Sequence, residues 1–361
     1  MTRIGTLARS LLAISAALSG CHADFSNDQA IARHQKLRIY STTDLKLFSP
    51  LIDDFHQLHP DIEIDYVTFE TSELDRRYRR DLAQGRTSAD LLLSSAMDQQ
   101  IKLVNDGYAT PHRSENAAQL PQWARWRDEA LGFTFEPAVM VVNLDVMKGR
   151  PIPQSRQDLL QAIRADHAFW TGRIGTYDIQ KSSIGYLVAS QDARHSSEFG
   201  ALAEAFREAD VVTEGGNEVL DRVASGELAL GYNLLGSNAR ARAARASNLR
   251  IVYPADYTLA IARTAVIPRS AANLRAAHIF LDYLLSERGQ RTLTLKSGLN
   301  AVRPDVERRY GSLNPRNPAM GPVRAIALGP GLLVYLDQQK RQQLLALWTA
   351  DKAQMPPRTD R

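Results

Sequence analysis

Strand and helix patterns alternate in the first part of the chain, and this order is the feature that most limits the possible folds. Residues 37–40 form a short strand pattern, and a helix pattern follows with apolar positions three and four apart: Phe48, Leu51, Ile52, Phe55 and Leu58. Residues 61–69 alternate as a second strand, and residues 72–84 form a charged helix. Residues 89–93 are a continuous apolar run, which is typical of a buried parallel strand. Strand, helix, strand, helix, strand predicts an open α/β sheet.

The remainder of the chain continues this pattern. Further strands are predicted at residues 138–143, 173–176, 210–212, 228–232 and 260–267. Residues 276–285 form a strongly amphipathic helix, and a last helix covers residues 336–349. A chain of 361 residues is long enough for two lobes, each with a core of its own.

The N-terminus has the pattern of a secretion signal that ends at the only cysteine. Arg3 and Arg9 give it a positive start, and the apolar run at residues 11–18 is too short to span a bilayer permanently. The tetrapeptide Leu18-Ser19-Gly20-Cys21 resembles a bacterial lipobox, in which the signal is cut before the cysteine and a lipid is attached to it. We therefore expect residues 1–20 to be a signal peptide and residues 21–35 to be a tether; an ordinary signal with a chance cysteine is the alternative.

The expected location follows from this anchor. A lipid on Cys21 would hold the mature protein at a membrane in the periplasm. In lipoproteins an aspartate after the cysteine commonly signals retention at the inner membrane, and this chain has His22 there. The resemblance therefore favours the outer membrane.

Composition and motifs exclude several classes of function. The net charge of +4 is weak evidence for any charged partner, and an aromatic content of 7% without a stacking platform argues against nucleic acid. The single cysteine leaves no intrachain disulfide. The chain has no Gly-x-Ser-x-Gly elbow, no Ser-x-x-Lys, no paired-histidine zinc helix and no Walker loop. We therefore predict that the chain is not an enzyme and has no cofactor, and we expect a monomer.

The order of segments resembles a known family, the type II periplasmic solute-binding proteins of ABC importers, in particular the branch of ferric-ion and organophosphate binders. The matching segments cover nearly the whole mature chain: residues 39–42, 88–95, 139–143, 226–233 and 277–290. The resemblance implies an α/β fold of two lobes, each a mixed sheet flanked by helices, with the ligand in the cleft between them. Two strands would cross between the lobes, near residues 136–143 and 252–262. The first lobe would then hold residues 36–137 and 256–361, and the second lobe residues 138–255.

Hydroxyl side chains stand where predicted strands give way to helices. Thr42 and Thr43, Ser94 and Ser95, and Ser182 and Ser183 occupy three such junctions. Ligands of open α/β sheets bind beyond the carboxyl ends of the strands, where helix N-termini favour anions. Hydroxyls hydrogen-bond an oxyanion without adding like charge. These six residues are therefore candidate ligand-binding residues; plain helix N-caps are the alternative, since Ser and Thr are favoured there.

The ferric branch binds its metal through an adjacent tyrosine pair, which this chain lacks. Leu234 and Leu235 stand where the resemblance would place the two tyrosines, and leucine supplies no ligand for a hard trivalent cation. We therefore predict no metal site and keep ferric ion only as an alternative. Tyr232 and Asn233 become candidate hydrogen-bonding contacts, and Arg263 or Arg303 is a candidate for neutralising the anion.

The sequence thus predicts an extracytoplasmic lipoprotein that binds a small anionic solute, such as a phosphate ester, a sulfonate or a carboxylate. The resemblance implies an ABC permease in the inner membrane as its partner. A sensor kinase of a two-component system is the alternative partner, because the binding chemistry of transport and of sensing would be the same.

Overall fold

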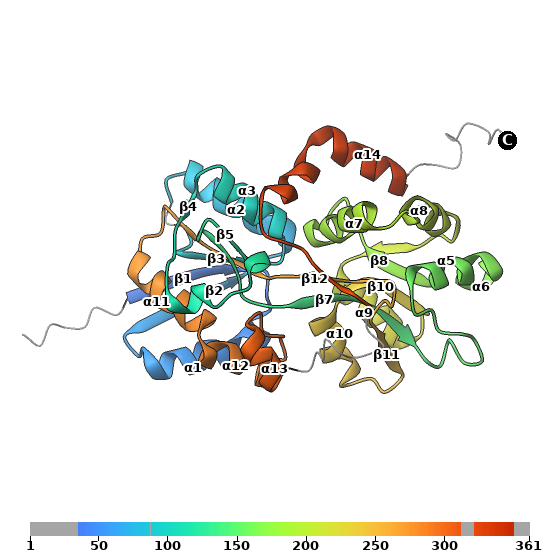
Figure 1. Ribbon diagram of the computed structural model, residues 1–361, viewed down its shortest axis with the longest axis horizontal. Coiled ribbons are helices and arrows are strands. Elements are labelled where there is room, and N and C mark those ends of the chain that lie inside the picture. Colours follow the sequence, from blue (N-terminus) through green and yellow to red (C-terminus); the bar gives the residue numbers. More distant parts are fainter. Residues whose placement is uncertain (1–34, 87, 312–320, 350–361) are drawn as a thin grey trace, which may run out of the picture. The chain divides into compact units, whose positions relative to one another are not determined.

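The computed structural model describes residues 35–86, 88–311 and 321–349 (Figure 1). The predicted signal peptide, Cys21 and almost all of the predicted tether lie outside the described residues. Within the described part of the chain, no helix is both long and apolar enough to cross a membrane.

The first sheet is mixed. Its order is β2 (Ile62–Thr68), β1 (Gln35–Ser41), β3 (Leu91–Ser94), β13 (Thr264–Pro268), β6 (Ala130–Gly132) and β5 (Arg125–Trp126), with β4 (Ala109–Thr110) paired to β13. Strand β1 is parallel to both β2 and β3, whereas β13 is antiparallel to β3 and β6. The strands predicted from the first part of the chain are therefore adjacent in space.

Helices flank this sheet. They are α1 (Leu45–Leu58), α2 (Thr71–Ala83), α3 (Met97–Asn105), α4 (Glu115–Ala118), the 3-10 helix η1 (Gln122–Ala124), α11 (Leu274–Leu285), α12 (Glu287–Leu295) and α13 (Pro304–Tyr310). The apolar stripe predicted for α1 belongs to the hydrophobic core of this lobe, where Phe48 and Phe55 are fully buried against Phe280 of α11. Leu58, at the end of that stripe, stays 43% exposed.

The second sheet is also mixed. Its order is β14 (Val323–Ala325), β12 (Thr258–Ile261), β7 (Glu136–Asn143), β10 (Leu230–Leu235), β8 (Ile174–Tyr177) and β9 (Val212–Glu214), with β11 (Leu249–Val252) paired to β7. The helices of this lobe are α5 (Arg156–Ala165), α6 (His167–Trp170), α7 (Ser183–His195), α8 (Phe199–Glu208), α9 (Gly216–Ser225) and α10 (Gly236–Ala243). Two mixed sheets flanked by helices confirm the predicted α/β fold class.

Two antiparallel strands connect the sheets. The first residues of β7 pair with the last residues of β12, and Ala262 and Arg263 then lead from β12 into β13 of the first sheet. The single strand predicted at residues 260–267 is therefore two strands in different sheets. The reason is a break in pairing at Arg263, whose backbone N–H donates to Thr134 Oγ1 (2.9 Å) instead of continuing the ladder.

The C-terminal segment is shared between the lobes, which differs from the prediction that residues 256–361 belong to the first lobe. Strand β14 pairs with β12, and the N–H of Leu328 donates to the carbonyl of Trp123 (2.8 Å). After the 3-10 helix η2 (Pro330–Leu336), helix α14 (Gln338–Thr349) packs its Trp348 against Phe199 and Phe206 of α8. These aromatic contacts hold the last helix on the second lobe.

Candidate functional site

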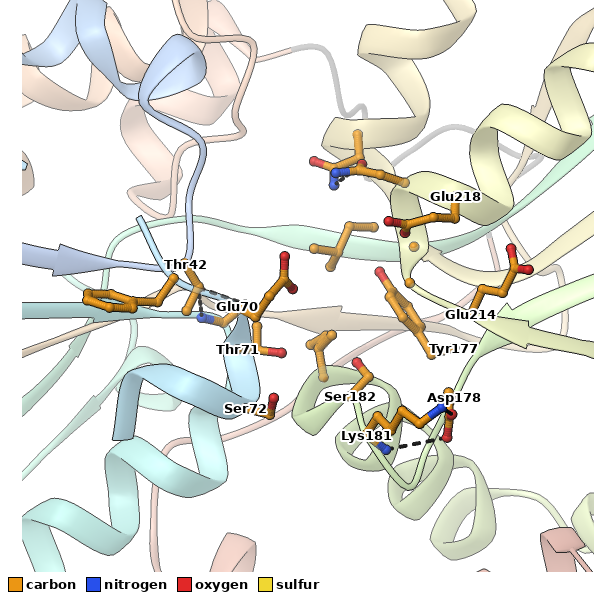
Figure 2. A pocket seen from close by; sticks show the side chains of 18 of the residues that line it. Thr42, Glu70, Thr71, Ser72, Tyr177, Asp178, Lys181, Ser182, Glu214 and Glu218 are labelled. Atoms are coloured by element: carbon orange, nitrogen blue, oxygen red, sulfur yellow. Dashed lines mark hydrogen bonds and ion pairs between the residues drawn. The ribbon is translucent and has the colours of Figure 1, made fainter. Parts of the chain in front are cut away.

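A cavity of about 600 Å³ lies where segments of both lobes meet (Figure 2). The first lobe lines it with residues that follow β1, β2 and β3, and the second lobe with residues that follow β8, β9 and β10. All six segments are turns from the carboxyl end of a strand into a helix. The cavity therefore occupies the edge at which open α/β sheets bind ligands.

Three of the predicted hydroxyl residues come together in this cavity: Thr42, Ser95 and Ser182. Thr42 Oγ1 accepts a hydrogen bond from the backbone N–H of Ser95 (3.1 Å) and lies 3.5 Å from Ser95 Oγ. Ser182, in the other lobe, caps α7 by accepting from the N–H of Gly185 (3.1 Å). Ser182 is thus both a helix cap and a cavity-lining residue.

The other predicted site residues lie outside the lining of the cavity. Ser94 Oγ accepts from the N–H of Ala96 (3.1 Å), and Thr43 is buried behind the cavity. Ser183 lines a neighbouring groove between α2, α3 and α7. Tyr232 and Asn233 are 1% and 3% exposed in the interior of the second lobe. Their strand β10 has a register shift between Gly231 and Leu234, and Asn233 has φ = 56°, so the alternation of side chains is broken there.

Tyr232 and Asn233 belong instead to a buried cluster around Asp192 of α7. Tyr232 Oη and Tyr257 Oη donate to the Asp192 carboxylate (2.7 and 2.8 Å), and Asn233 Nδ2 donates to it (2.5 Å). Arg156 Nε completes the set with a hydrogen bond to Asp192 Oδ1 (3.0 Å). Burial is the main cause that raises the pKa of both tyrosines; the charge of Arg156 opposes this rise and that of Asp192 adds to it, so both phenols stay protonated as donors to the carboxylate.

Arg263 is a buried cation that is hydrogen-bonded to one of the predicted hydroxyls. Its side chain lines the cavity and the residue is only 3% exposed. Nε donates to Glu136 Oε1 (3.2 Å), and Nη1 donates to Thr43 Oγ1 (2.9 Å). Arg303, the other candidate, lies outside the cavity lining and pairs with Asp305 (2.9 Å). In the sequence analysis the two arginines are equal candidates. The structure brings only Arg263 to the cavity.

Helix N-termini add backbone donors. Helices α1, α2, α9 and α10 all begin in segments that line the cavity. Their N-cap residues are Asp44, Glu70, Gly215 and Leu235, and none of these residues caps its helix through a side chain. In α10 the N–H of Ser237 donates instead to Glu136 Oε2 (3.3 Å). The first N–H groups of a helix have no partner within the helix, and together with the helix dipole they favour an anion.

Acidic side chains form the part of the lining that sequence reasoning missed. Five carboxylates line the cavity: Asp44, Glu70, Asp178, Glu214 and Glu218. Asp178 pairs with Lys181 (3.2 Å), and Glu214 pairs with Arg222 (2.7 Å). The available signal was the position of Glu70 between the predicted strand at residues 61–69 and the predicted helix at residues 72–84, because the prediction used only hydroxyls at such junctions.

Tyr177 supplies a further polar group on the wall of the second lobe. It is 5% exposed, and burial raises the pKa of its phenol to about 12. The phenol is therefore neutral at pH 7 and can donate a hydrogen bond. Nowhere in the described residues do three or more His, Cys, Asp or Glu side chains form a group that could hold a metal ion.

Comparison with known proteins agrees with this architecture. Residues 41–291 match the family model described as bacterial extracellular solute-binding protein. The substrate-binding protein of an ABC transporter from Agrobacterium tumefaciens is 35% identical, with a TM-score of 0.81, over 87% of this chain and 93% of that chain. The comparison with curated proteins gives no significant match.

More distant structures share the fold alone. AfuA from Actinobacillus pleuropneumoniae, solved with fructose-6-phosphate, is 18% identical with a TM-score of 0.71, over 87% of this chain and 97% of that chain. Iron-bound HitA from Pseudomonas aeruginosa is 17% identical with a TM-score of 0.68, over 87% and 98%. The match over most of the chain, on a fold of two mixed sheets, shows that this protein belongs to the bacterial extracellular solute-binding protein family.

Proposed function

We propose that this protein binds a small anionic solute, such as a phosphate ester, in the cavity between its lobes and delivers it to an ABC importer. The single observation that carries the proposal is the set of donors that line one cavity. It combines hydroxyls of both lobes, the starts of helices α1, α2 and α9, and a buried arginine. A sulfonate or carboxylate would use the same donors.

The binding mechanism that we propose is closure of the lobes on the solute. Thr42 and Ser95 come from the first lobe, and Tyr177 and Ser182 come from the second. An anion that accepts hydrogen bonds from both sets is bound more tightly when the lobes are closed, and the difference in affinity shifts the population toward the closed form.

Ferric ion is the less favoured ligand. Leu234 and Leu235 are apolar, and Tyr232 is buried with its hydroxyl hydrogen-bonded to Asp192 (2.7 Å). The protein mixed with ferric citrate is therefore expected to show no visible tyrosinate-to-iron charge-transfer band. A stoichiometric band that disappears in Tyr177→Phe or Tyr232→Phe would show that a tyrosine ligates iron and would reverse this choice.

A thermal-shift screen of the purified protein tests the proposed ligand class. The panel holds phosphate esters, sulfonates, carboxylates and ferric citrate. A ligand at 100 times its dissociation constant stabilises the folded state by about 2.7 kcal/mol, which is a readily measured shift in Tm. A stabilising anion supports the proposal, whereas a panel in which only ferric citrate stabilises the protein contradicts it.

Alanine variants separate binding from helix capping. Ser95→Ala is expected to weaken anion binding by about 1.5–3 kcal/mol with little change in the stability of the free protein, because Ser95 Oγ caps no helix. Ser182→Ala is expected to reduce both quantities, since its oxygen also caps α7; the lost cap alone costs about 0.5–2 kcal/mol. Calorimetric titration and chemical unfolding measure the two effects. Unchanged affinity in both variants would remove these hydroxyls from the site.

We also propose that a lipid on Cys21 anchors the protein. The Cys21→Ser variant is expected to lose lipid labelling and to accumulate unprocessed in cells. A variant that is still cut at the same bond and still partitions into membranes would contradict the lipoprotein assignment.

A further inference from the structure

The cavity that we propose as an anion site is lined mainly by negative charge. Its lining holds five carboxylates but only two cations, Lys181 and Arg263. Lys181 already pairs with Asp178, and Arg263 already pairs with the buried Glu136. Glu214 is neutralised from outside the lining by Arg222. Three lining carboxylates therefore have no ion pair among the described residues: Asp44, Glu70 and Glu218.

Two of these carboxylates face the cavity from different lobes. Glu70 precedes α2 in the first lobe, and Glu218 lies in the first turn of α9 in the second lobe. Figure 2 shows their side chains directed into the cavity from opposite sides. Closure of the lobes would therefore bring like charges together in a space from which water is being excluded, and that opposes closure unless a cation lies between them.

Both kinds of lining groups, hydroxyls and carboxylates, occupy the same cavity. The hydroxyls of Thr42 and Ser95 lie within 3.5 Å of one another, and the buried Arg263 lines the cavity with them. A cavity of about 600 Å³ is within the range of pockets that enclose whole organic molecules, so it has room for a second functional group beside an oxyanion.

We infer that the natural solute is zwitterionic, with a protonated amine bound between Glu70 and Glu218 and its anionic group bound by the hydroxyls, the helix N-termini and Arg263. This inference rests on the proposed function, since it assumes an anionic group in the same cavity. The amine donates charge-assisted hydrogen bonds to both carboxylates and removes the repulsion between the lobes. A hydroxyl in the same place could donate one hydrogen bond but would leave the charge uncompensated.

The competing explanation is that Glu70 and Glu218 only stabilise the starts of their helices and bind no ligand. Acids at helix N-termini interact favourably with the helix dipole without any ligand. In that case replacing them would change the stability of the protein, and the choice between ligands would stay the same.

Matched pairs of compounds test the inference by titration calorimetry on the purified protein. Each pair shares an anionic group and differs in one amine: 2-aminoethyl phosphate and ethyl phosphate, taurine and ethanesulfonate, β-alanine and propionate. Glycerol 3-phosphate is added to test hydroxyls. In the anion class that binds, the amino compound is expected to bind at least about tenfold more tightly than its partner.

Charge-neutral variants then locate the amine. Glu70→Gln and Glu218→Gln should each remove most of the preference for the amino compound and leave the affinity for its partner unchanged or higher. The matched controls Glu63→Gln and Glu208→Gln, exposed residues of the two lobes outside the lining, should keep the preference.

The outcomes separate this inference from the proposed function. Equal affinities within a pair, a preference that survives both variants, or a gain with glycerol 3-phosphate alone would overturn the zwitterion and leave the anion site standing. A further compound, 1,3-diaminopropane, carries amines and no anionic group. Its binding, with no binding of any anion, would overturn the anion site and, with it, the zwitterion. The absence of any binding in the whole set would contradict both.

Discussion

Replacement of Asp192 by alanine is expected to lower the free energy of unfolding by about 3 kcal/mol, because it removes the buried counter-ion of the buried Arg156 and leaves this arginine with the more exposed Asp256 alone. Arg156 and Asp192 are each 1% exposed and form an ion pair of 3.0 Å. The same change also removes the acceptor of the hydroxyls of Tyr232 and Tyr257. Urea unfolding at pH 7 measures the loss.

Controls for Asp192→Ala distinguish the buried pair from a general effect of removing an acid. Asp145→Ala, at an exposed position of the same lobe, should change stability by less than about 0.5 kcal/mol. Joint replacement of Arg156 and Asp192 by methionine and leucine should be less destabilising than the sum of the single changes, because no buried charge is left unpaired and Asp256, the other partner of Arg156, is exposed. A loss below about 1 kcal/mol in Asp192→Ala would show that the cluster contributes little.

Arg263→Met is expected to have two large effects. Glu136 is fully buried and would lose its cation, which lowers the free energy of unfolding by about 3–5 kcal/mol. The cavity would also lose its buried positive charge, and the affinity for an anion should fall by about tenfold or more. Unfolding and titration calorimetry on one preparation measure both effects.

The conservative variant keeps the second effect testable if Arg263→Met folds poorly. Arg263→Lys retains the charge next to Glu136 and should recover part of the stability, but it loses the second branch that bonds Thr43. Arg275→Met, at an exposed position on α11, is the control. An Arg263→Lys variant that folds and binds the anion as the wild type does would show that a point charge is sufficient there.

The sequence predicted the fold well where local patterns carry the information. The apolar stripe of the first helix and the apolar run at residues 89–93 depend on short-range periodicity, and the structure confirms a helix and a buried strand there. Placing hydroxyls at the carboxyl ends of strands predicted that Thr42 and Ser95 lie together, because the parallel strands β1 and β3 end at one edge of the first sheet. Ser182 lines the same cavity from the second lobe.

Other features depended on contacts that the sequence does not show. The register shift in β10 breaks the alternation that the sequence suggested, so the orientation of Tyr232 and Asn233 could not be read from spacing. The pairing of Arg263 with Glu136 joins residues that are far apart in sequence, on the strands that connect the lobes. The packing of α14 on the second lobe likewise depends on distant partners, Phe199 and Phe206.

Hydrogen–deuterium exchange with and without the anion that stabilises the protein most in the screen tests the central claim most directly. If the solute binds between the lobes, amides should gain protection in both of them, at the starts of α1 and α2 and after Ser95 in the first lobe, and at the starts of α7 and α9 in the second. Protection should be absent from surface helices away from the cavity, such as α5. Protection confined to one lobe, or to segments outside these junctions, would contradict binding in this cavity.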